Sequence, residues 1–301
     1  MSRPLIIRPL TPRPLLAPLD RRWVVSGLLL LSVWLLTLTL ASALLNLAGV
    51  MLNGGGQAQL QAHGHPFVDT RELWGVPNAA DVLSNLPFVA VGVIGLWQLR
   101  RLPMDTLVGD TQRALKVFFC GLVLTGLLSA VYHWQPDAWG LAMDRTGMAV
   151  GFAGVLALAA ADRVGQREAR LTLWVVLPLA IVSAWLPLTH DNVLPWAVVQ
   201  FGGIALVLSV ARRSRVGGGL GVCWVGLIAI YALAKWAEVS DEAIFQVTGG
   251  WVSGHTLKHL VAALAAWPVI TALRQNARIA GRIDRVVAEQ VQHSEEPLHV
   301  R

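Results

Sequence analysis

Charged side chains are scarce in this sequence: only 14% of its 301 residues are Asp, Glu, Lys or Arg, whereas 55% are hydrophobic. The mean hydropathy of +0.57 is too high for a soluble domain, and the apolar residues are spread too evenly for a single membrane anchor. These proportions exclude an ordinary soluble protein. They predict an all-α fold, a polytopic helix bundle embedded in a membrane.

Cysteine is also rare, and its placement excludes two classes of protein. Cys120 and Cys223 both lie within apolar runs. Neither a disulfide framework nor a zinc site built from thiolates is therefore indicated. Lysine is nearly absent while arginine is frequent, which is typical of a bacterial protein encoded in a GC-rich genome.

A basic surface for nucleic acid is missing as well, although the net charge is +6. Most basic residues are arginines in short segments between apolar runs, whereas a nucleic-acid partner needs a basic face on a folded domain. We therefore expect a membrane bilayer, and no nucleic acid, as the partner of this chain. No protein partner is indicated by the sequence.

The apolar runs divide the chain into five parts. We predict a basic cytoplasmic tail at 1–22, an extra transmembrane helix at 23–47, an outer loop at 48–80, a seven-helix core at 81–272 and a cytoplasmic tail at 273–301. A cleaved signal peptide is the weaker interpretation of 23–47, because its apolar part is too long. The seven predicted spans of the core are 81–99, 113–133, 141–161, 170–187, 193–211, 218–237 and 251–272.

Arginine alternates between the connections of these spans. The turns after the first, third, fifth and seventh core spans are basic, whereas the turns 134–140 and 188–194 contain no Lys or Arg. The positive-inside rule then predicts that both termini are cytoplasmic, in agreement with eight spans. We expect an integral protein of the bacterial inner membrane.

Five polar residues lie at the outer ends of these spans and share one depth: Ser129, His133, Asp144, His255 and His259. His255 and His259 are four residues apart, so on a helix their imidazoles lie on one face. Three histidines, with a fourth position left to water, form a typical catalytic zinc site. We predict a zinc ion bound by His133, His255 and His259 near the periplasmic side, with Asp144 as a proton acceptor and donor and Ser129 beside it.

Each of these residues also has a simpler interpretation. A single membrane histidine is more often a packing residue, Asp144 can pair with Arg145 or lie at a helix N-terminus, and serine is common at close helix contacts. His63, His65 and His190 are expected to be solvated. Lys258 is expected to turn away from the shared histidine face and to pair with Glu238, Asp241 or Glu242, or to reach the interface.

This pattern resembles the alkaline ceramidase family: Ser-x3-His, an aspartate eleven residues later and a late His-x3-His in a seven-helix membrane core. That family belongs to a wider group of membrane hydrolases that also includes the adiponectin and progestin receptors. A second similar stretch runs from Asp69-Thr70-Arg71 through Pro77-Asn78-Ala79-Ala80-Asp81-Val82-Leu83-Ser84-Asn85. The resemblance covers roughly residues 65–272, and the helix at 23–47 is additional to the family's seven.

The resemblance implies a zinc-dependent hydrolase that cleaves the amide of a ceramide-like lipid into a fatty acid and a sphingoid base. Asp144 and Ser129 would be its catalytic residues, and a long-chain N-acyl lipid would be its substrate. Animal members of the family bind calcium through an acidic segment before the first core helix. The residues that stand there in this chain, with altered spacing, are Asp69, Glu72, Asn78 and Asp81.

Two other functions remain open on the sequence. A membrane haem protein with axial histidines would explain His133 and one of the late histidines, but it leaves Ser129 and Asp144 without a role. A zinc-containing, non-catalytic receptor-like protein would carry the same residues.

Overall fold

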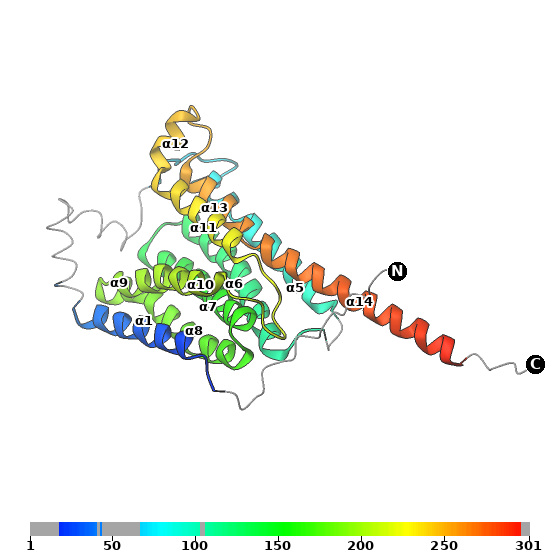
Figure 1. Cartoon of the computed structure of the whole chain (residues 1–301). Helices are drawn as coiled ribbons and strands as arrows, with labels where there is room; N and C mark the ends of the chain where they lie inside the picture. Colours follow the sequence, from blue (N-terminus) through cyan, green and yellow to red (C-terminus); the bar gives the residue numbers. More distant parts are fainter. Residues whose placement is uncertain (1–17, 41–42, 44–66, 103–105, 296–301) are drawn as a thin grey trace, which may run out of the picture.

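A computed structural model describes residues 18–40, 43, 67–102 and 106–295. In these ranges the chain is a bundle of α-helices without strands (Figure 1). Seven of its helical segments are long and apolar enough to cross a membrane: Arg21–Thr39, Ala79–Arg100, Gly109–Trp134, Ala138–Arg163, Gln166–His190, Leu194–Ala211 and Gly254–Arg282. The predicted all-α, polytopic membrane bundle is confirmed.

The extra N-terminal helix is present as α1 (Arg21–Thr39). Asp20 caps it, since its carboxylate accepts a hydrogen bond of 2.8 Å from the Trp23 backbone N–H. The indole of Trp34 donates to the Ser183 hydroxyl at 2.8 Å, which fixes α1 against α8 (Gln166–His190). Residues 41–42 and 44–47 of the predicted helix 23–47 lie outside the described part of the chain. So do residues 1–17 of the predicted basic tail and 48–66 of the predicted outer loop.

The centre of the bundle is the pair α6 (Gly109–Trp134) and α7 (Ala138–Arg163). Their backbones approach so closely that a Cβ atom on Gly154 would lie 2.3 Å from the Phe118 nitrogen. Apolar tails give little net drive for two helices to associate inside a membrane, so close packing of small residues takes that role. This contact places the end of α6 beside the start of α7.

Two of the predicted spans contain a change of helical geometry. The first core span is divided into α4 (Ala79–Leu83) and α5 (Leu86–Arg100), with Pro87 in the first turn of α5. The fifth consists of α9 (Leu194–Ala197), a π-helical turn (Val198–Gly202) and α10 (Gly203–Ala211). Both spans agree with the predicted ranges to within a few residues.

The predicted span 218–237 begins later than expected, as α11 (Trp224–Val239). Residues 218–223 are not helical, and the buried carboxylate of Asp162 binds them: it accepts hydrogen bonds from the Gly221 and Val222 backbone nitrogens at 2.6 and 3.1 Å and from the Trp224 indole at 2.7 Å. With 16 residues, α11 is about 24 Å long, less than the roughly 30 Å of a bilayer's hydrocarbon core. By length and composition, seven rather than eight helical segments of the described chain qualify as spans.

The last span begins at α13 (Gly254–Leu264) and continues into α14 (Trp267–Glu295). The two helices meet just before Pro268, which interrupts the hydrogen-bonding pattern between them. A short helix that the sequence did not predict, α12 (Asp241–Val247), precedes α13. The predicted C-terminal tail from 273 is helical to Glu295, and α14 extends beyond the rest of the bundle (Figure 1).

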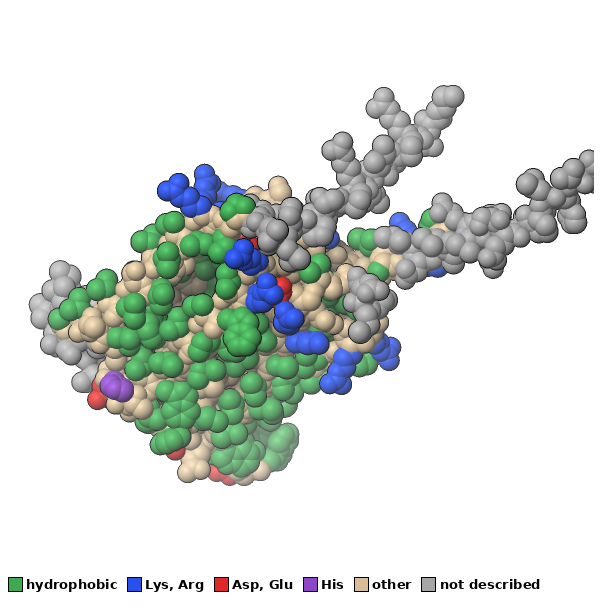
Figure 2. Space-filling view, turned by 90° about the horizontal axis from the view of Figure 1, so that it is seen from below, with side chains coloured by type: hydrophobic (Ala, Val, Ile, Leu, Met, Phe, Trp, Pro, Cys, Tyr) green, Lys and Arg blue, Asp and Glu red, His purple; other side chains and the backbone are tan. Residues whose placement is uncertain are grey.

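The helix ends divide by charge. Arg21, Arg100, Arg163, Arg167 and Arg212 lie at or next to helix termini that we call the arginine end. The opposite termini, which carry the three candidate metal ligands and His190, form the histidine end. Figure 2 shows the molecule from below, the side on which α1 lies in Figure 1. This face is largely hydrophobic, and its Lys and Arg side chains gather away from the histidine visible at the opposite edge.

Candidate metal centre

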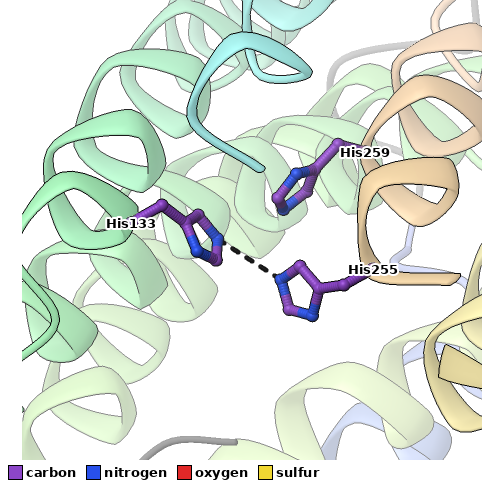
Figure 3. A group of neighbouring side chains, drawn as sticks. All are labelled: His133, His255 and His259. Carbon is purple, nitrogen blue, oxygen red and sulfur yellow. Dashed lines mark hydrogen bonds between the residues drawn. The ribbon is translucent and has the colours of Figure 1, made fainter. Parts of the chain in front are cut away.

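Three imidazoles meet at the histidine end. His133 comes from the last turn of α6, and His255 and His259 come from the first turns of α13 (Figure 3). Their potential ligand atoms all lie within 4.8 Å of one another, and the side chains are buried, with exposed fractions of 1%, 7% and 4%. The structure thus brings together residues that are more than 120 positions apart in sequence.

The position of α13 follows from contacts at its N-terminus. The hydroxyl of Ser253 caps the helix by accepting a hydrogen bond of 2.9 Å from the Thr256 nitrogen. The Asp241 carboxylate accepts another hydrogen bond from the backbone nitrogen of His255 at 2.7 Å. Gly254 lies so close to α11 that a Cβ there would be 2.2 Å from the Ala237 carbonyl oxygen. Together these contacts direct the first turn of α13, and hence His255, toward the end of α6.

Ser84 determines which nitrogen of His259 faces the other two imidazoles. Its hydroxyl donates to the Asp81 carbonyl oxygen at 3.0 Å, so its contact of 2.9 Å with His259 Nδ1 must use the serine oxygen as acceptor. His259 Nδ1 then carries the proton, and a neutral ring keeps the lone pair on Nε2. Partners of this kind fix the tautomer of histidines that bind metals.

His133 is held by its backbone and by aromatic packing. The Asn78 side chain donates to the His133 carbonyl oxygen at 2.9 Å. The ring of Phe67 lies 4.7 Å from the His133 ring and 5.7 Å from the His255 ring, measured between centroids. This apolar cover limits the access of bulk water to the cluster from the side of Phe67.

The three ligand atoms lie within 4.8 Å of one another, and one pair has the separation expected around a tetrahedral ion. His133 Nε2 and His255 Nε2 are 3.3 Å apart. Nitrogens bound to zinc at its usual distance in a tetrahedral site are separated by about 3.3–3.4 Å. In the part of the chain that the structure describes, this triad is the group of His, Cys, Asp or Glu side chains that has metal-binding spacing.

Ser129 and Asp144 lie next to this cluster. Ser129 is buried one helical turn before His133, and its hydroxyl makes a polar contact with the carboxylate of Asp144, which is half-buried on α7. Asp144 also interacts electrostatically with Lys258 and with its neighbour Arg145. The five polar residues that the sequence grouped by depth therefore lie at one end of the bundle.

Lys258 reaches the cluster, which the sequence did not predict. Its Cα lies off the shared face of His255 and His259, as predicted, but its long side chain curves back and brings Nζ to 2.9 Å from His255 Nε2. Its pairing with Glu238 is confirmed, at 3.1 Å. Glu238 also pairs with Lys235, so one carboxylate holds two ammonium groups beside the site.

The residues suggested for calcium have protein partners in this structure. The Asp81 carboxylate accepts a hydrogen bond of 2.6 Å from Thr256 and so ties α4 to α13. Asp69 binds the Arg71 guanidinium through both carboxylate oxygens; burial opposes ionisation, but the hydrogen bonds and charge of Arg71 outweigh it and lower the pKa of Asp69. Asn78 is used by His133, and Glu72 is exposed. Calcium binding here stays a prediction.

The other histidines are not part of the cluster. His190 is exposed at the end of α8, as expected for a solvated residue, and His63 and His65 lie outside the described residues. Comparison of the sequence with protein-family models and with curated proteins gives no match. The resemblance to the alkaline ceramidases therefore rests on the residues quoted above.

Proposed function

We propose that this chain is a zinc-dependent membrane amidohydrolase that cleaves the amide bond of ceramide-like lipids. The observation that carries the proposal is the buried triad of His133, His255 and His259, with the Ser129–Asp144 pair one helical turn away. Burying ionisable side chains in a membrane protein is costly, so a buried histidine cluster usually has a function. The carboxylate beside it supplies the group that a hydrolysis needs for proton transfer.

Zinc is the metal that suits the donor set best. Three neutral imidazoles without thiolates are typical of catalytic zinc. When bound, zinc supplies a Lewis acid that polarises a carbonyl and lowers the pKa of water. The protein's part is to keep the three nitrogens unprotonated, which Ser84 does for His259.

Asp144 is proposed to move the protons of the reaction. As water adds to the amide carbonyl carbon, the carboxylate accepts one of its protons and passes it to the nitrogen when the carbon–nitrogen bond breaks. The products are a fatty acid and a free amine, the sphingoid base. Ser129 orients this carboxylate, and its hydroxyl can turn to donate to the oxygen on which negative charge develops.

The location of the cluster suits a lipid substrate. The triad lies at the end of long apolar helices, the depth at which the amide of a two-tailed lipid sits near the interface while its tails remain among the helices. The arginine end is expected to face the cytoplasm under the positive-inside rule. We accordingly propose a protein of the bacterial inner membrane with cytoplasmic termini and a site near the periplasmic side.

A haem protein fits the geometry less well. Axial histidines lie on opposite faces of a porphyrin, which must fit between them. The His133 and His255 nitrogens are only 3.3 Å apart, and the third imidazole lies within 4.8 Å of both. This arrangement favours one ion over a ring. A non-catalytic zinc protein would share the triad, so an assay of turnover has to distinguish it.

The test combines metal analysis with an assay of fatty-acid release. The purified chain is expected to contain about one zinc per molecule, to show no Soret band and to release fatty acid from at least one lipid in a panel of N-acyl lipids. His255→Ala should lose both zinc and release, whereas His190→Ala, which alters an exposed histidine, should lose neither. Purified wild-type protein that binds no zinc, or binds zinc but hydrolyses no N-acyl lipid, would contradict the proposal.

A further inference from the structure

A second feature lies at the arginine end, on the other side of the bundle from the triad. A cavity of about 730 Å³ opens between the start of α1 and the end of α10. Its lining consists of Arg21, Arg22, Val25, Ser26, Ser209, Arg212 and Arg213. The two helices are far apart in sequence, so the fold, rather than one basic run, brings four arginines to the lining of one open cavity.

The positive charge in this cavity is only partly neutralised. Arg213 pairs with Asp20 at 3.1 Å. In the described ranges, the side chains of Arg21, Arg22 and Arg212 make no ion pair or hydrogen bond. Asp20 and Glu168 are the acids nearby, and Asp20 donates its backbone N–H to Glu168 at 2.9 Å. Like charges gathered in this way repel each other unless an anion lies between them.

The groups in the cavity match a phosphate. Guanidinium groups bind phosphate oxygens in a bidentate manner and keep their charge at any physiological pH. Ser26 adds a hydroxyl donor, whereas the Ser209 hydroxyl already donates to the Leu206 carbonyl at 2.6 Å. The positive-inside tendency accounts for arginines at this end of the bundle, but it does not by itself arrange four of them around one cavity.

The walls next to the cavity indicate the source of that phosphate. Val25 lines the cavity and is 45% exposed, and Leu28 and Leu29 of the following turn are 57% and 62% exposed. An apolar helix face that begins at a cluster of arginines suits an acyl chain joined to an anionic headgroup. Basic pockets between membrane helices bind anionic lipid headgroups in this way.

We propose that the cavity between α1 and α10 is a binding site for an anionic phospholipid, whose phosphate lies among Arg21, Arg22, Arg212 and Arg213 and whose acyl chain runs along α1. The site is separate from the triad and does not depend on the proposed hydrolysis. It gives a role to α1, which the proposed hydrolysis does not use.

The experiment measures lipid retention by the purified full-length chain in mixed micelles that contain either phosphatidylglycerol or phosphatidylcholine. The wild type is expected to retain phosphatidylglycerol preferentially, and less of it as salt increases. The double variant Arg21→Gln/Arg212→Gln should bind it about tenfold more weakly or worse. The control, Arg167→Gln/Arg170→Gln, removes two exposed arginines from the neighbouring start of α8 and should change binding less than twofold.

A parallel arm uses inorganic phosphate at millimolar concentration, which has no acyl chain and is expected not to displace the lipid. Equal retention of the two lipids by the wild type would overturn the proposal without recourse to any variant. An equal loss in the control variant would also overturn it, because the effect would then not depend on the arginines of the cavity. Displacement of the lipid by phosphate alone would do the same, since the cavity would then hold an anion of any kind.

Discussion

The Ser84 hydroxyl donates its single proton to the Asp81 carbonyl, so toward His259 Nδ1 its oxygen can only accept a hydrogen bond. Ser84 therefore favours the tautomer of His259 that carries the proton on Nδ1. Ser84→Ala removes this acceptor, leaves only the Asp81 carbonyl beside the ring, and makes it easier for His259 to adopt the tautomer that presents N–H to the cluster. We expect zinc affinity to fall by roughly 10–100-fold, as for other outer partners of metal-binding histidines. Competition with a zinc chelator measures the change. Ser209→Ala removes the same type of hydroxyl-to-carbonyl bond at the arginine end and should leave zinc affinity unchanged.

Asp144 is expected to affect turnover without affecting the metal. Asp144→Asn keeps the shape of the side chain but cannot accept a proton, so fatty-acid release should fall by roughly 10²–10⁴-fold while zinc content stays at the wild-type level. Asp137→Asn is the matched control, because Asp137 caps α7 and asparagine caps equally well. Unchanged turnover in the Asp144 variant would refute the proton-transfer role.

Lys258 places an ammonium group on the same lone pair of His255 that a metal would use. Lys258→Met removes this competing cation, and repulsion of a dication at such short range corresponds to at least roughly a tenfold effect on affinity. Zinc binding should therefore become tighter. Lys235→Met also removes an ammonium from Glu238 but has no contact with His255, so it should have a smaller effect. Weaker zinc binding after Lys258→Met would show that the lysine supports the site instead.

At the residue scale the sequence predicted the three histidines that the structure brings together and missed the residues that orient them. His133, His255 and His259 were recognisable because ligands have characteristic types and spacings. Ser84 was not assigned this role, because its partner is 175 residues away and serine has many uses. The pairing of Lys258 with Glu238 was predicted, but its contact with His255 was not, because a helical wheel fixes the direction of Cβ but not the path of a flexible four-carbon chain.

At the scale of helices, the contact between α6 and α7 can be tested at Gly154. A Cβ there would lie 2.3 Å and 2.5 Å from backbone atoms of Phe118, which cannot move without shifting a helix. Gly154→Ala should therefore destabilise the bundle by about 1–3 kcal/mol and lower the Tm by several degrees. Gly27→Ala on α1 is the control, since nothing lies within 4 Å of its Cβ position. Tryptophan fluorescence during heating in detergent measures the Tm of both variants. An unchanged Tm for Gly154→Ala would contradict the described contact.

Helix positions were predictable from hydropathy because membrane spans are long and continuous. The exceptions have specific causes. Residues 218–223 are as apolar as a helix start, yet the Asp162 carboxylate binds the backbone N–H groups of Gly221 and Val222 and holds the segment out of the helix. The expected end of the last span at 272 reflects a change in polarity, whereas the helix itself continues to Glu295 because nothing in that stretch interrupts its backbone hydrogen bonds.

For the whole molecule, the separation of the arginine end from the histidine end predicts its orientation in the membrane. Helix α8 has exposed residues at both ends, Arg167 at the arginine end and His190 at the histidine end, and its 25 residues extend about 37 Å. In a background that lacks Cys120 and Cys223, a membrane-impermeant maleimide should label His190→Cys in intact bacterial cells but Arg167→Cys only after permeabilisation. Arginine is retained on the cytoplasmic side, so this pattern follows from the positive-inside rule. The opposite pattern would place the triad at the cytoplasmic surface, and it would require a substrate that reaches the site from that leaflet.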